Sequence, residues 1–294
     1  MLTVKKIIKS YRRFRRFRRI TPALEPFSYT FDHGLYGILG PNGAGKSTLL
    51  SILARNLRPD GGQVLLDGED VRSRKTGYPA RLGYLPQNGG GYPDVSAEDF
   101  LRYVAVSKGA SRTEAEAQSH AILRDIDLYD CRHDRVASFS GGTVSRLLLA
   151  QAFMGNPEVV ILDEPTASMD PAWRACARKL MAREAQNRTV LLATHIVSDV
   201  ESAAREVLLL RRGRLVDSGT PFELTEKVRG RVWGITVYPE EVPTFTARFR
   251  IAAMANTKEG VTLRILSNRR PAPEAVAVDP NLEDYYLCFT GELL

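Results

Sequence analysis

The feature that most constrains the fold of this chain is a glycine-rich loop, Gly40–Ser47, with the sequence GPNGAGKS. It follows a short apolar stretch, Leu35–Leu39, that is typical of a buried strand, and an apolar segment typical of a helix comes directly after it. Strand, loop and helix in this order, with the pattern GxxxxGK[ST], predict a P-loop, in which backbone N–H groups cradle phosphate oxygens at a helix N-terminus. The chain is therefore expected to be an α/β nucleotide-binding protein.

The residue types in this loop suggest a role for each position. Lys46 is predicted to reach the β and γ phosphates of ATP, and Ser47 to place its hydroxyl on Mg²⁺. The backbone N–H groups of the loop would hold the remaining phosphate oxygens. The predicted ATP-binding residues of the loop are Gly40, Asn42, Gly43, Ala44, Gly45, Lys46, Ser47 and Thr48.

A second motif is an apolar stretch, Val159–Leu162, that ends in two carboxylates, Asp163 and Glu164. A buried strand that delivers an acid at its end, in a chain with a P-loop, is typical of a metal-binding arrangement. We expect Asp163 to hold Mg²⁺, directly or through water. Glu164 is then placed to polarise the water that attacks the γ-phosphate.

Shorter motifs occur in order around these two, and the chain resembles the nucleotide-binding domain of an ABC transporter over residues 1–228. Ser140, Gly141 and Gly142, ahead of a predicted helix at Thr143–Met154, resemble the ABC signature. In that family the serine and the glycine N–H groups bind the γ-phosphate held by the P-loop of a second subunit. The resemblance therefore implies ATP as ligand and a second nucleotide-binding subunit as partner.

Four further positions resemble functional elements of the same family. Gln87 resembles the Q-loop glutamine, which touches Mg²⁺ or the attacking water and senses the membrane subunit. His195 resembles the switch histidine, which acts at the γ-phosphate. Ala167–Asp170 resembles the D-loop, and Tyr11 lies where the family places an aromatic ring against adenine. By resemblance, the catalytic residues are Glu164, His195 and Gln87, and the Mg²⁺ ligands are Ser47, Gln87 and Asp163.

The sequence departs from the family pattern at two motifs. The family signature usually reads LSGGQ, whereas Phe139 and Thr143 flank Ser-Gly-Gly here. Both changes leave the phosphate-contacting core intact, although they alter the residues with which the signature helix packs. The D-loop has Ser168 and Met169 where a small residue and leucine are usual. Neither departure removes a group to which the resemblance gives a catalytic role.

The predicted fold is a P-loop NTPase core of α/β class with an antiparallel β subdomain and an inserted helical subdomain. Residues 1–229 form the nucleotide-binding domain, with the helical insertion at about 88–155. Residues 230–294 form a small α+β extension. This extension resembles that of exporter-type ATPase subunits whose permease is a separate polypeptide. The resemblance implies an ATPase that powers export from the cytoplasmic face of a membrane, with the permease contacting the surface at Asn88–Phe100.

Composition narrows the class of protein. The sequence has no apolar run near the roughly 20 residues that a membrane helix needs. The N-terminus lacks the apolar core of a secretory signal, so we expect the chain to stay in the cytoplasm. The cysteines, at positions 131, 176 and 288, have no metal-binding spacing, which argues against zinc and disulfides.

Nine basic residues lie between Lys5 and Arg19, and no acidic residue precedes Glu25. Without these nine, the formal net charge falls from +7 to −2, so the basic character belongs to one patch and nucleic-acid binding is disfavoured. One alternative remains a soluble ABC ATPase that acts on nucleic acid or ribosomes through this patch. Its translation-type members usually carry two nucleotide domains, whereas one P-loop is present here. An importer ATPase is the other alternative.

The arginine run Arg12–Arg19 generates the first prediction, since it is either a solvated loop between strands or a contact for anionic lipid or acidic permease loops. Cations near an anionic leaflet contribute about 1 kcal/mol each. Changing all six arginines of the run to glutamine should leave ATP binding intact and reduce sedimentation with anionic liposomes. Raised salt should mimic the loss in the native protein. Native protein that ignores such liposomes at low salt would contradict the lipid contact.

Overall fold

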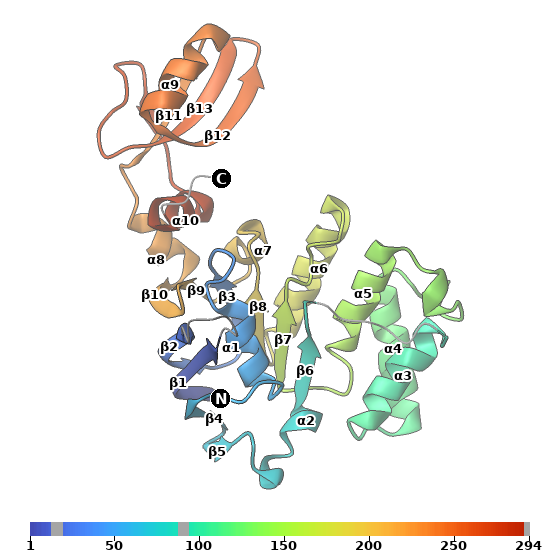
Figure 1. Ribbon diagram of the computed structural model, residues 1–294. Helices are drawn as coiled ribbons and strands as arrows, with labels where there is room; N and C mark the ends of the chain where they lie inside the picture. The colour runs from blue at the N-terminus through green and yellow to red at the C-terminus, as the bar shows by residue number, and fades with distance from the viewer. Residues whose placement is uncertain (13–19, 88–93, 291–294) are drawn as a thin grey trace. The chain divides into compact units, whose positions relative to one another are not determined.

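The computed structural model describes residues 1–12, 20–87 and 94–290 (Figure 1). The described chain divides into two compact units, Met1–Asp217 and Ser218–Leu294. The predicted domain boundary at residue 229 lies within the second unit and stays a prediction. Residues 13–19, which carry most of the arginine run, lie outside the described residues, so the predicted lipid contact also stays a prediction. Among the described residues, no helix combines the length and apolar character needed to cross a membrane.

A six-stranded sheet forms the centre of the first unit, with strand order β10-β9-β3-β8-β7-β6. Neighbouring strands from β9 to β6 run parallel. Strands β7 and β8 are buried at every position, as expected of parallel strands covered on both faces, which explains their continuous apolar sequence. The strands are β3 (Gly34–Leu39), β6 (Leu82–Leu85), β7 (Val159–Asp163), β8 (Thr189–Ala193), β9 (Glu206–Arg211) and β10 (Arg214–Gly219).

A second sheet of the first unit is antiparallel and has the order β2-β1-β4-β5. Strands β1 and β2 pair from Leu2 opposite Phe31 to Arg12 opposite Ile20, so Tyr11 lies at the end of the pair remote from the N-terminus. The antiparallel subdomain predicted from the sequence is therefore present. Its strands are β1 (Leu2–Arg12), β2 (Ile20–Phe31), β4 (Gly61–Leu66) and β5 (Glu69–Asp70), of which β5 had no sequence signal.

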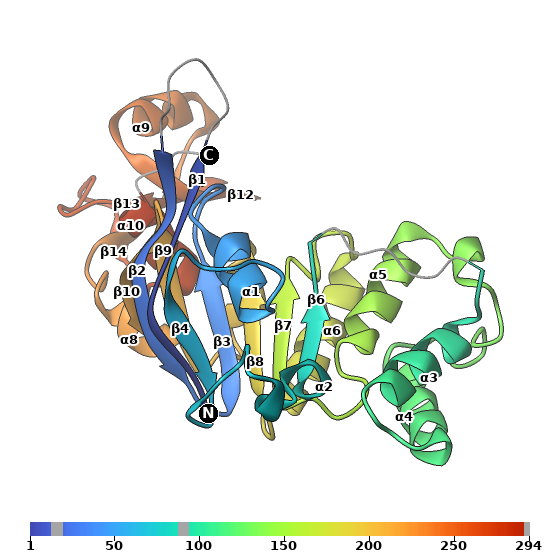
Figure 2. The same ribbon diagram turned by 60° about the horizontal axis from the view of Figure 1, so that its bottom comes forward.

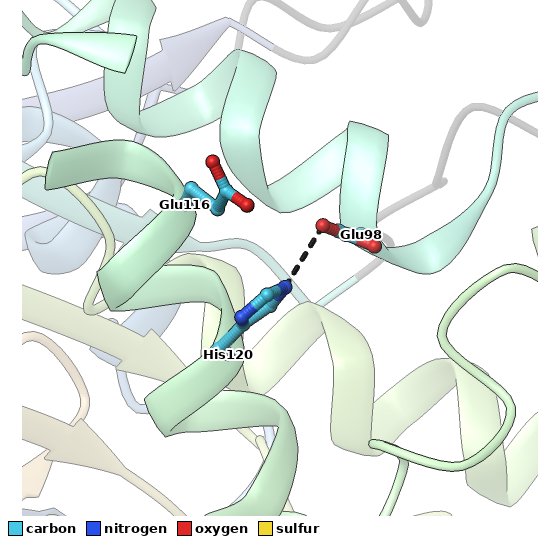
Figure 3. A group of neighbouring side chains, drawn as sticks. All are labelled: Glu98, Glu116 and His120. Atoms are coloured by element: carbon cyan, nitrogen blue, oxygen red, sulfur yellow. Dashed lines mark hydrogen bonds and ion pairs between the residues drawn. The ribbon is translucent and has the colours of Figure 1, made fainter. Parts of the chain in front are cut away.

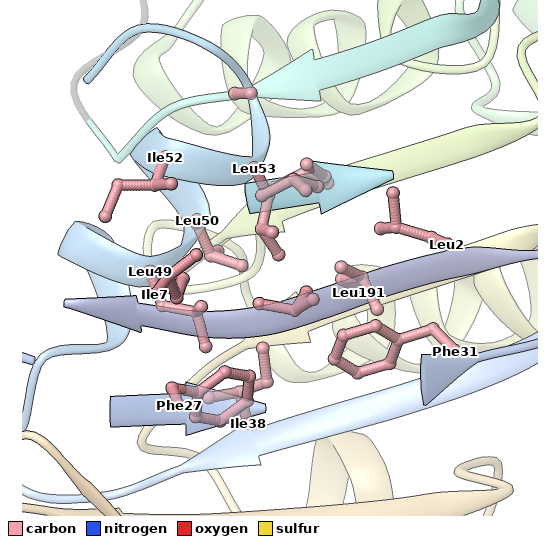
Figure 4. Packing of buried hydrophobic residues seen from close by; sticks show 14 of the residues in the cluster. Leu2, Ile7, Phe27, Phe31, Ile38, Leu49, Leu50, Ile52, Leu53 and Leu191 are labelled. Carbon is pink, nitrogen blue, oxygen red and sulfur yellow. The ribbon is translucent and has the colours of Figure 1, made fainter. Parts of the chain in front are cut away.

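The main core lies where helix α1 (Lys46–Leu53) packs between the two sheets. Leu49, Leu50 and Leu53 of the helix are almost completely buried. They belong to one cluster with side chains of both sheets, and Figure 4 shows them together with Phe27 of the antiparallel sheet and Leu191 of the parallel sheet. Burying such leucines contributes about 1.5–3 kcal/mol each. The helix that follows the P-loop is thus anchored by the packing of both sheets.

The other helices of the first unit fall into two groups. Helices α3, α4 and α5 lie beyond the β6 edge of the parallel sheet and form the predicted helical insertion (Figure 2). Helix α5 begins at Gly141 and ends at Gln151, so the predicted range Thr143–Met154 is wrong at both ends. The helix starts two residues earlier than predicted because Ser140 caps it. The helices are α2 (Tyr78–Arg81), α3 (Ala97–Ser107), α4 (Arg112–Asp125), α5 (Gly141–Gln151), α6 (Pro171–Glu184) and α7 (Ser198–Glu201). Two 3₁₀ turns, Arg74–Thr76 and Val136–Ser138, complete the unit.

Backbone hydrogen bonds close the chain around α3 and α4. Ala97 N donates to Asp134 O at 3.2 Å, and Val136 N donates to Val95 O at 3.0 Å. Ser96 and Arg135 also form an isolated β-bridge. The two ends of this excursion are therefore joined before the chain continues into the signature motif.

The second unit holds a four-stranded sheet of order β12-β13-β11-β14 with helix α9 packed on it. Buried Asp284 on α10 accepts hydrogen bonds from both Nε and Nη2 of Arg264 in β13, with Oδ1 at 2.9 Å from Nε, and this pair fixes the helix to the sheet. The elements are α8 (Pro221–Glu226), β11 (Val232–Val237), a 3₁₀ turn (Pro239–Glu241), α9 (Val242–Arg248), β12 (Arg250–Thr257), β13 (Gly260–Leu266), β14 (Val276–Ala277) and α10 (Leu282–Thr290).

Close packing of Gly83 in β6 generates a stability prediction. A Cβ atom at this position would lie 1.8 Å from the carbonyl oxygen of Ala152. Gly83→Ala is therefore expected to lower the free energy of unfolding by about 3 kcal/mol, measured by denaturant titration without nucleotide. Gly141→Ala is the matched control, since a Cβ there meets nothing within 4 Å, and it should shift stability by less than about 1 kcal/mol. Similar midpoints for both variants would contradict this packing.

Candidate nucleotide-binding site

The P-loop joins β3 to α1 and requires glycine where it enters the helix. Gly45 is the N-cap of α1 and has φ of 104°, in the left-handed region that side chains disfavour. A Cβ there would also lie 2.6 Å from the carbonyl oxygen of Ala23 in β2. The loop backbone therefore lies tight against the antiparallel sheet. Its N–H groups and the N-terminus of α1 provide the positive potential that a phosphate needs.

Lys46 is held inside the loop that it is predicted to serve. Its Nζ donates to the carbonyl oxygen of Gly40 at 2.6 Å and more weakly to that of Pro41 at 3.4 Å, and the residue is 7% exposed. Burial lowers the pKa of Lys46, while Glu164 and Asp163 oppose the shift. The ammonium is therefore poorly solvated, and a phosphate brought next to it would supply the missing countercharge.

Asp163 lies at the end of β7 with one oxygen unsatisfied. It is 3% exposed, and its Oδ1 is buried without a hydrogen-bond partner. Burial raises the pKa of Asp163, Glu164 adds to the rise, and the Ser47 hydroxyl and Lys46 oppose it. An orphaned carboxylate oxygen beside a serine hydroxyl fits a hard cation with oxygen ligands, such as Mg²⁺.

Glu164 follows in a strained backbone conformation. Its φ is 52°, which is rare for a residue with a side chain, and its N–H donates to Ala193 O at 2.9 Å. Glu164 Oε2 lies 2.8 Å from Nδ1 of His195, which follows the neighbouring strand β8. The glutamate side chain is 9% exposed and the histidine 58%. Strain of this kind persists where the surroundings hold it, and here the bonds to Ala193 and His195 do so.

One pocket of about 530 Å³ gathers residues that are far apart in the sequence. Tyr11 from β1, Gln87 after β6 and Glu164 after β7 line it together with the P-loop. The Tyr11 hydroxyl lies 3.5 Å from Thr48 Oγ1, so the ring stands beside the start of α1. The structure therefore brings together most of the site predicted from the sequence. Its lining residues are Tyr11, Pro22, Ala23, Asn42, Gly43, Ala44, Gly45, Lys46, Ser47, Thr48, Gln87 and Glu164.

The signature residues lie elsewhere. A second pocket, also of about 530 Å³, is lined by Gly141 and Ser145 of α5 together with Ser168, Gln87 and Glu164. Among the described residues that line the P-loop pocket, none comes from 140–142. Ser140 is exposed and is the N-cap of α5, so it lies directly before the first residue of that helix. Within one chain, the predicted signature does not reach the P-loop pocket.

Several known proteins are similar to this chain in sequence. A family profile described as ABC transporter matches residues 24–167. Over 237 residues the chain is 30% identical to an uncharacterized ABC transporter ATP-binding protein, YxlF, of Bacillus subtilis, covering 81% of this chain and 77% of that protein. It is 32% identical over 274 residues to Nod factor export ATP-binding protein I of Burkholderia thailandensis, covering 87% and 88%. The chain belongs to the ABC transporter ATP-binding protein family.

Another relative is far longer than this chain. The human retinal-specific phospholipid-transporting ATPase ABCA4 is 34% identical over 204 residues, and the match spans 69% of this chain but 9% of that protein. Its similarity is thus confined to a small part of a large polypeptide. The activity of that whole protein is not transferred to this chain.

Solved ABC proteins have the same fold. A dimeric ATP-binding cassette in a post-hydrolysis state, bound to ADP and Pi, superimposes with a TM-score of 0.67 at 22% identity, covering 75% of this chain and 98% of that one. A bacterial Atm1-family ABC exporter with ATP bound gives 0.66 at 26% identity, covering 77% and 39%. The predicted P-loop NTPase fold class is confirmed.

A buried network that the motifs did not indicate holds the predicted D-loop of this ABC protein. Arg174 Nε on α6 donates to the carbonyl oxygens of Thr166 and Met169 at 3.3 and 3.0 Å. The Thr166 hydroxyl donates to Asp199, which is fully buried and paired with Arg178 at 3.2 Å. In the sequence, the only indication of this network was weak: Arg174 and Arg178 lie four residues apart and so share one helix face. The buried acidic partner of Arg178, Asp199 on α7, could be identified only from the fold.

A second group of polar residues lies in the helical insertion. Glu98, Glu116 and His120 have ligand-type atoms within 4.8 Å of one another, and His120 Nε2 lies 3.0 Å from Glu98 Oε1 (Figure 3). Arg102 and Arg132 also approach Glu98, at 4.0 and 3.8 Å. Because these arginines already balance the charge of Glu98, we interpret the group as a structural link between α3 and α4.

Lys46 generates the prediction for this site. Lys46→Ala should weaken ATP binding at least about a hundredfold, because alanine removes the charged hydrogen bonds to the phosphates, each worth about 1.5–3 kcal/mol. Isothermal calorimetry with ATP is the measurement. Lys75→Ala, at an exposed lysine of the same unit, is the control and should bind normally. Near-normal affinity of the Lys46 variant would reject the assignment of the P-loop.

Proposed function

We propose that this chain binds ATP with Mg²⁺, hydrolyses it in a dimer, and thereby powers a separate membrane permease that exports its substrate. The observation that carries the proposal is the proximity of Lys46, Asp163 and Glu164: Lys46 and Glu164 line the P-loop pocket, and Asp163 and Glu164 line the adjoining pocket beside α5. These charges act on one another. Burial lowers the pKa of Lys46, and the two carboxylates oppose that shift. A nucleotide triphosphate and a divalent cation together complement one buried cation and two carboxylates.

The residues act as follows in this proposal. The P-loop N–H groups and Lys46 hold the phosphates, and Tyr11 stacks on adenine. Ser47, Asp163 and Gln87 hold Mg²⁺, which neutralises charge on the phosphate oxygens when it is bound. Glu164 accepts a proton from the attacking water. His195 keeps the Glu164 carboxylate in position and contacts the γ-phosphate region.

A second subunit completes the site in this proposal. Ser140, Gly141 and Gly142 are predicted to contact the γ-phosphate held by the partner's P-loop. Support comes from their place at the exposed N-terminus of α5, outside the P-loop pocket of their own chain. Further support comes from the dimeric state of a solved cassette with this fold. Two copies of this chain would thus form two composite sites.

The proposal of an exporter with a separate permease rests on the relatives. A protein named for Nod factor export is covered over 88% of its length by this chain. That match spans 87% of this chain, so it includes part of the second unit, because the first ends at Asp217. Part of the second unit is therefore shared with an ATP-binding protein named for export. We place the chain on the cytoplasmic face of a membrane, bound to its permease.

Glu164→Gln tests the proposed hydrolysis. The amide keeps the shape of the side chain but cannot accept a proton, so ATP should bind with turnover reduced at least about a hundredfold, as expected when a general base is lost. An ATP-bound dimer should accumulate, measured by light scattering with ATP and Mg²⁺. Glu69→Gln, at an exposed glutamate of β5, is the control and should retain turnover. If Glu164→Gln keeps most of its turnover, another group is the base.

A further inference from the structure

The hydroxyl of Thr143 lies between the predicted signature serine and a fixed arginine. Thr143 Oγ1 is 2.9 Å from Ser140 Oγ, and Arg146 Nη2 donates to the same Thr143 oxygen at 3.2 Å. The backbone N–H of Thr143 also donates to Ser140 Oγ, at 3.2 Å. All three residues belong to the first turns of α5 or to its N-cap. The serine oxygen therefore meets two possible donors from one residue.

Arg146 is fixed in place by its other contacts. Its guanidinium lies 3.8 Å from the ring centroid of Trp173 on α6, and Nη1 donates to Ile126 O at 3.3 Å. Arginine has no acceptor and remains charged at all physiological pH values. Its bond to Thr143 therefore always occupies a lone pair of that hydroxyl. The positive charge also favours the state in which Thr143 gives its own proton to a neighbour.

The proton balance then decides the direction of the Ser140 hydroxyl. When Thr143 donates through both N–H and O–H, both lone pairs of Ser140 Oγ are occupied. The serine proton must then point away from α5, towards an acceptor outside the chain. A hydroxyl that accepts hydrogen bonds is also a stronger donor. A terminal phosphate oxygen is an acceptor that fits this arrangement.

We propose that Thr143 is a positioning residue. Held by Arg146, which packs on Trp173, it directs the Ser140 hydroxyl to donate to the terminal phosphate of a nucleotide that is bound to a second copy of this chain. The inference rests on the proposed function and deepens it. Thr143 stands where the family signature usually has glutamine. In this chain, the departure from the usual pattern thus supplies a hydrogen-bond relay to the serine.

Thr143→Val tests the relay, because valine has the shape of threonine without the hydroxyl. The backbone bond from residue 143 to Ser140 remains, so the cap of α5 is kept. The variant is made in the Glu164→Gln background, and dimerisation with ATP and Mg²⁺ is followed by analytical ultracentrifugation. We expect the dimer dissociation constant to rise about tenfold, about 1.4 kcal/mol. ATP affinity of the monomer should not change.

Two further variants separate the relay from packing. Thr143→Ser retains the hydroxyl and should restore dimerisation to within about threefold of the parent. Arg146→Gln should weaken dimerisation, and its effect should not add to that of Thr143→Val, because both act through one bond chain. Additive effects, failure of Thr143→Ser to restore dimerisation, or an unchanged dissociation constant for Thr143→Val would each overturn the proposal.

Ser140→Ala distinguishes failure of the relay from failure of the proposed function. If Ser140→Ala weakens the dimer whereas Thr143→Val does not, the relay is wrong and the two-subunit site stands. If the Glu164→Gln parent forms no dimer with ATP, both proposals are overturned. Thermal unfolding without nucleotide accompanies each variant. A parallel loss of unfolding temperature and dimerisation in Thr143→Val and Thr143→Ser would assign the effect to packing and overturn the relay.

Discussion

The nucleotide pocket depends on charged groups that the fold keeps from water where strands β3 and β7 of the parallel sheet end. Lys46 bonds to backbone oxygens, Asp163 has an oxygen without a partner, and Glu164 is held by His195. Isolated buried charges are costly, and the packing of α1 between two sheets supplies the free energy that keeps these groups in place. A ligand that carries both negative charge and a cation relieves all of them together. In the proposed function, selectivity for a metal-bound polyphosphate follows from the charges that these buried groups leave unbalanced.

Two pockets share a wall in this structure. Gln87 and Glu164 line both the P-loop pocket and the pocket beside α5. A change in either side chain therefore alters the surroundings of the nucleotide and of the signature helix at once. In the proposed dimer, this shared wall would connect events at the phosphate with the surface that meets the second subunit.

Sequence reasoning predicted the features that are local. The P-loop and the apolar strand before Asp163 are each contained in a few consecutive residues, so pattern and chemistry sufficed. The left-handed backbone of Glu164 was not predictable, because the surrounding strands impose it. The pairing of Thr166 with Asp199 joins residues 33 positions apart, and the contact of Arg146 with Trp173 joins two helices. Such contacts require the tertiary fold, which single-sequence patterns do not contain.

The backbone closure between residues 95–98 and 132–136 has a consequence for how such a chain can change over evolutionary time. Because the polypeptide leaves and returns at paired positions, the α3–α4 excursion is a side branch of the chain path. Its length can vary without changing the strand order of the parallel sheet, whereas the residues that contact α5, such as Ile126, must keep their places. Related proteins can therefore diversify this branch, and any recognition surface on it, while the chemistry beneath stays constant.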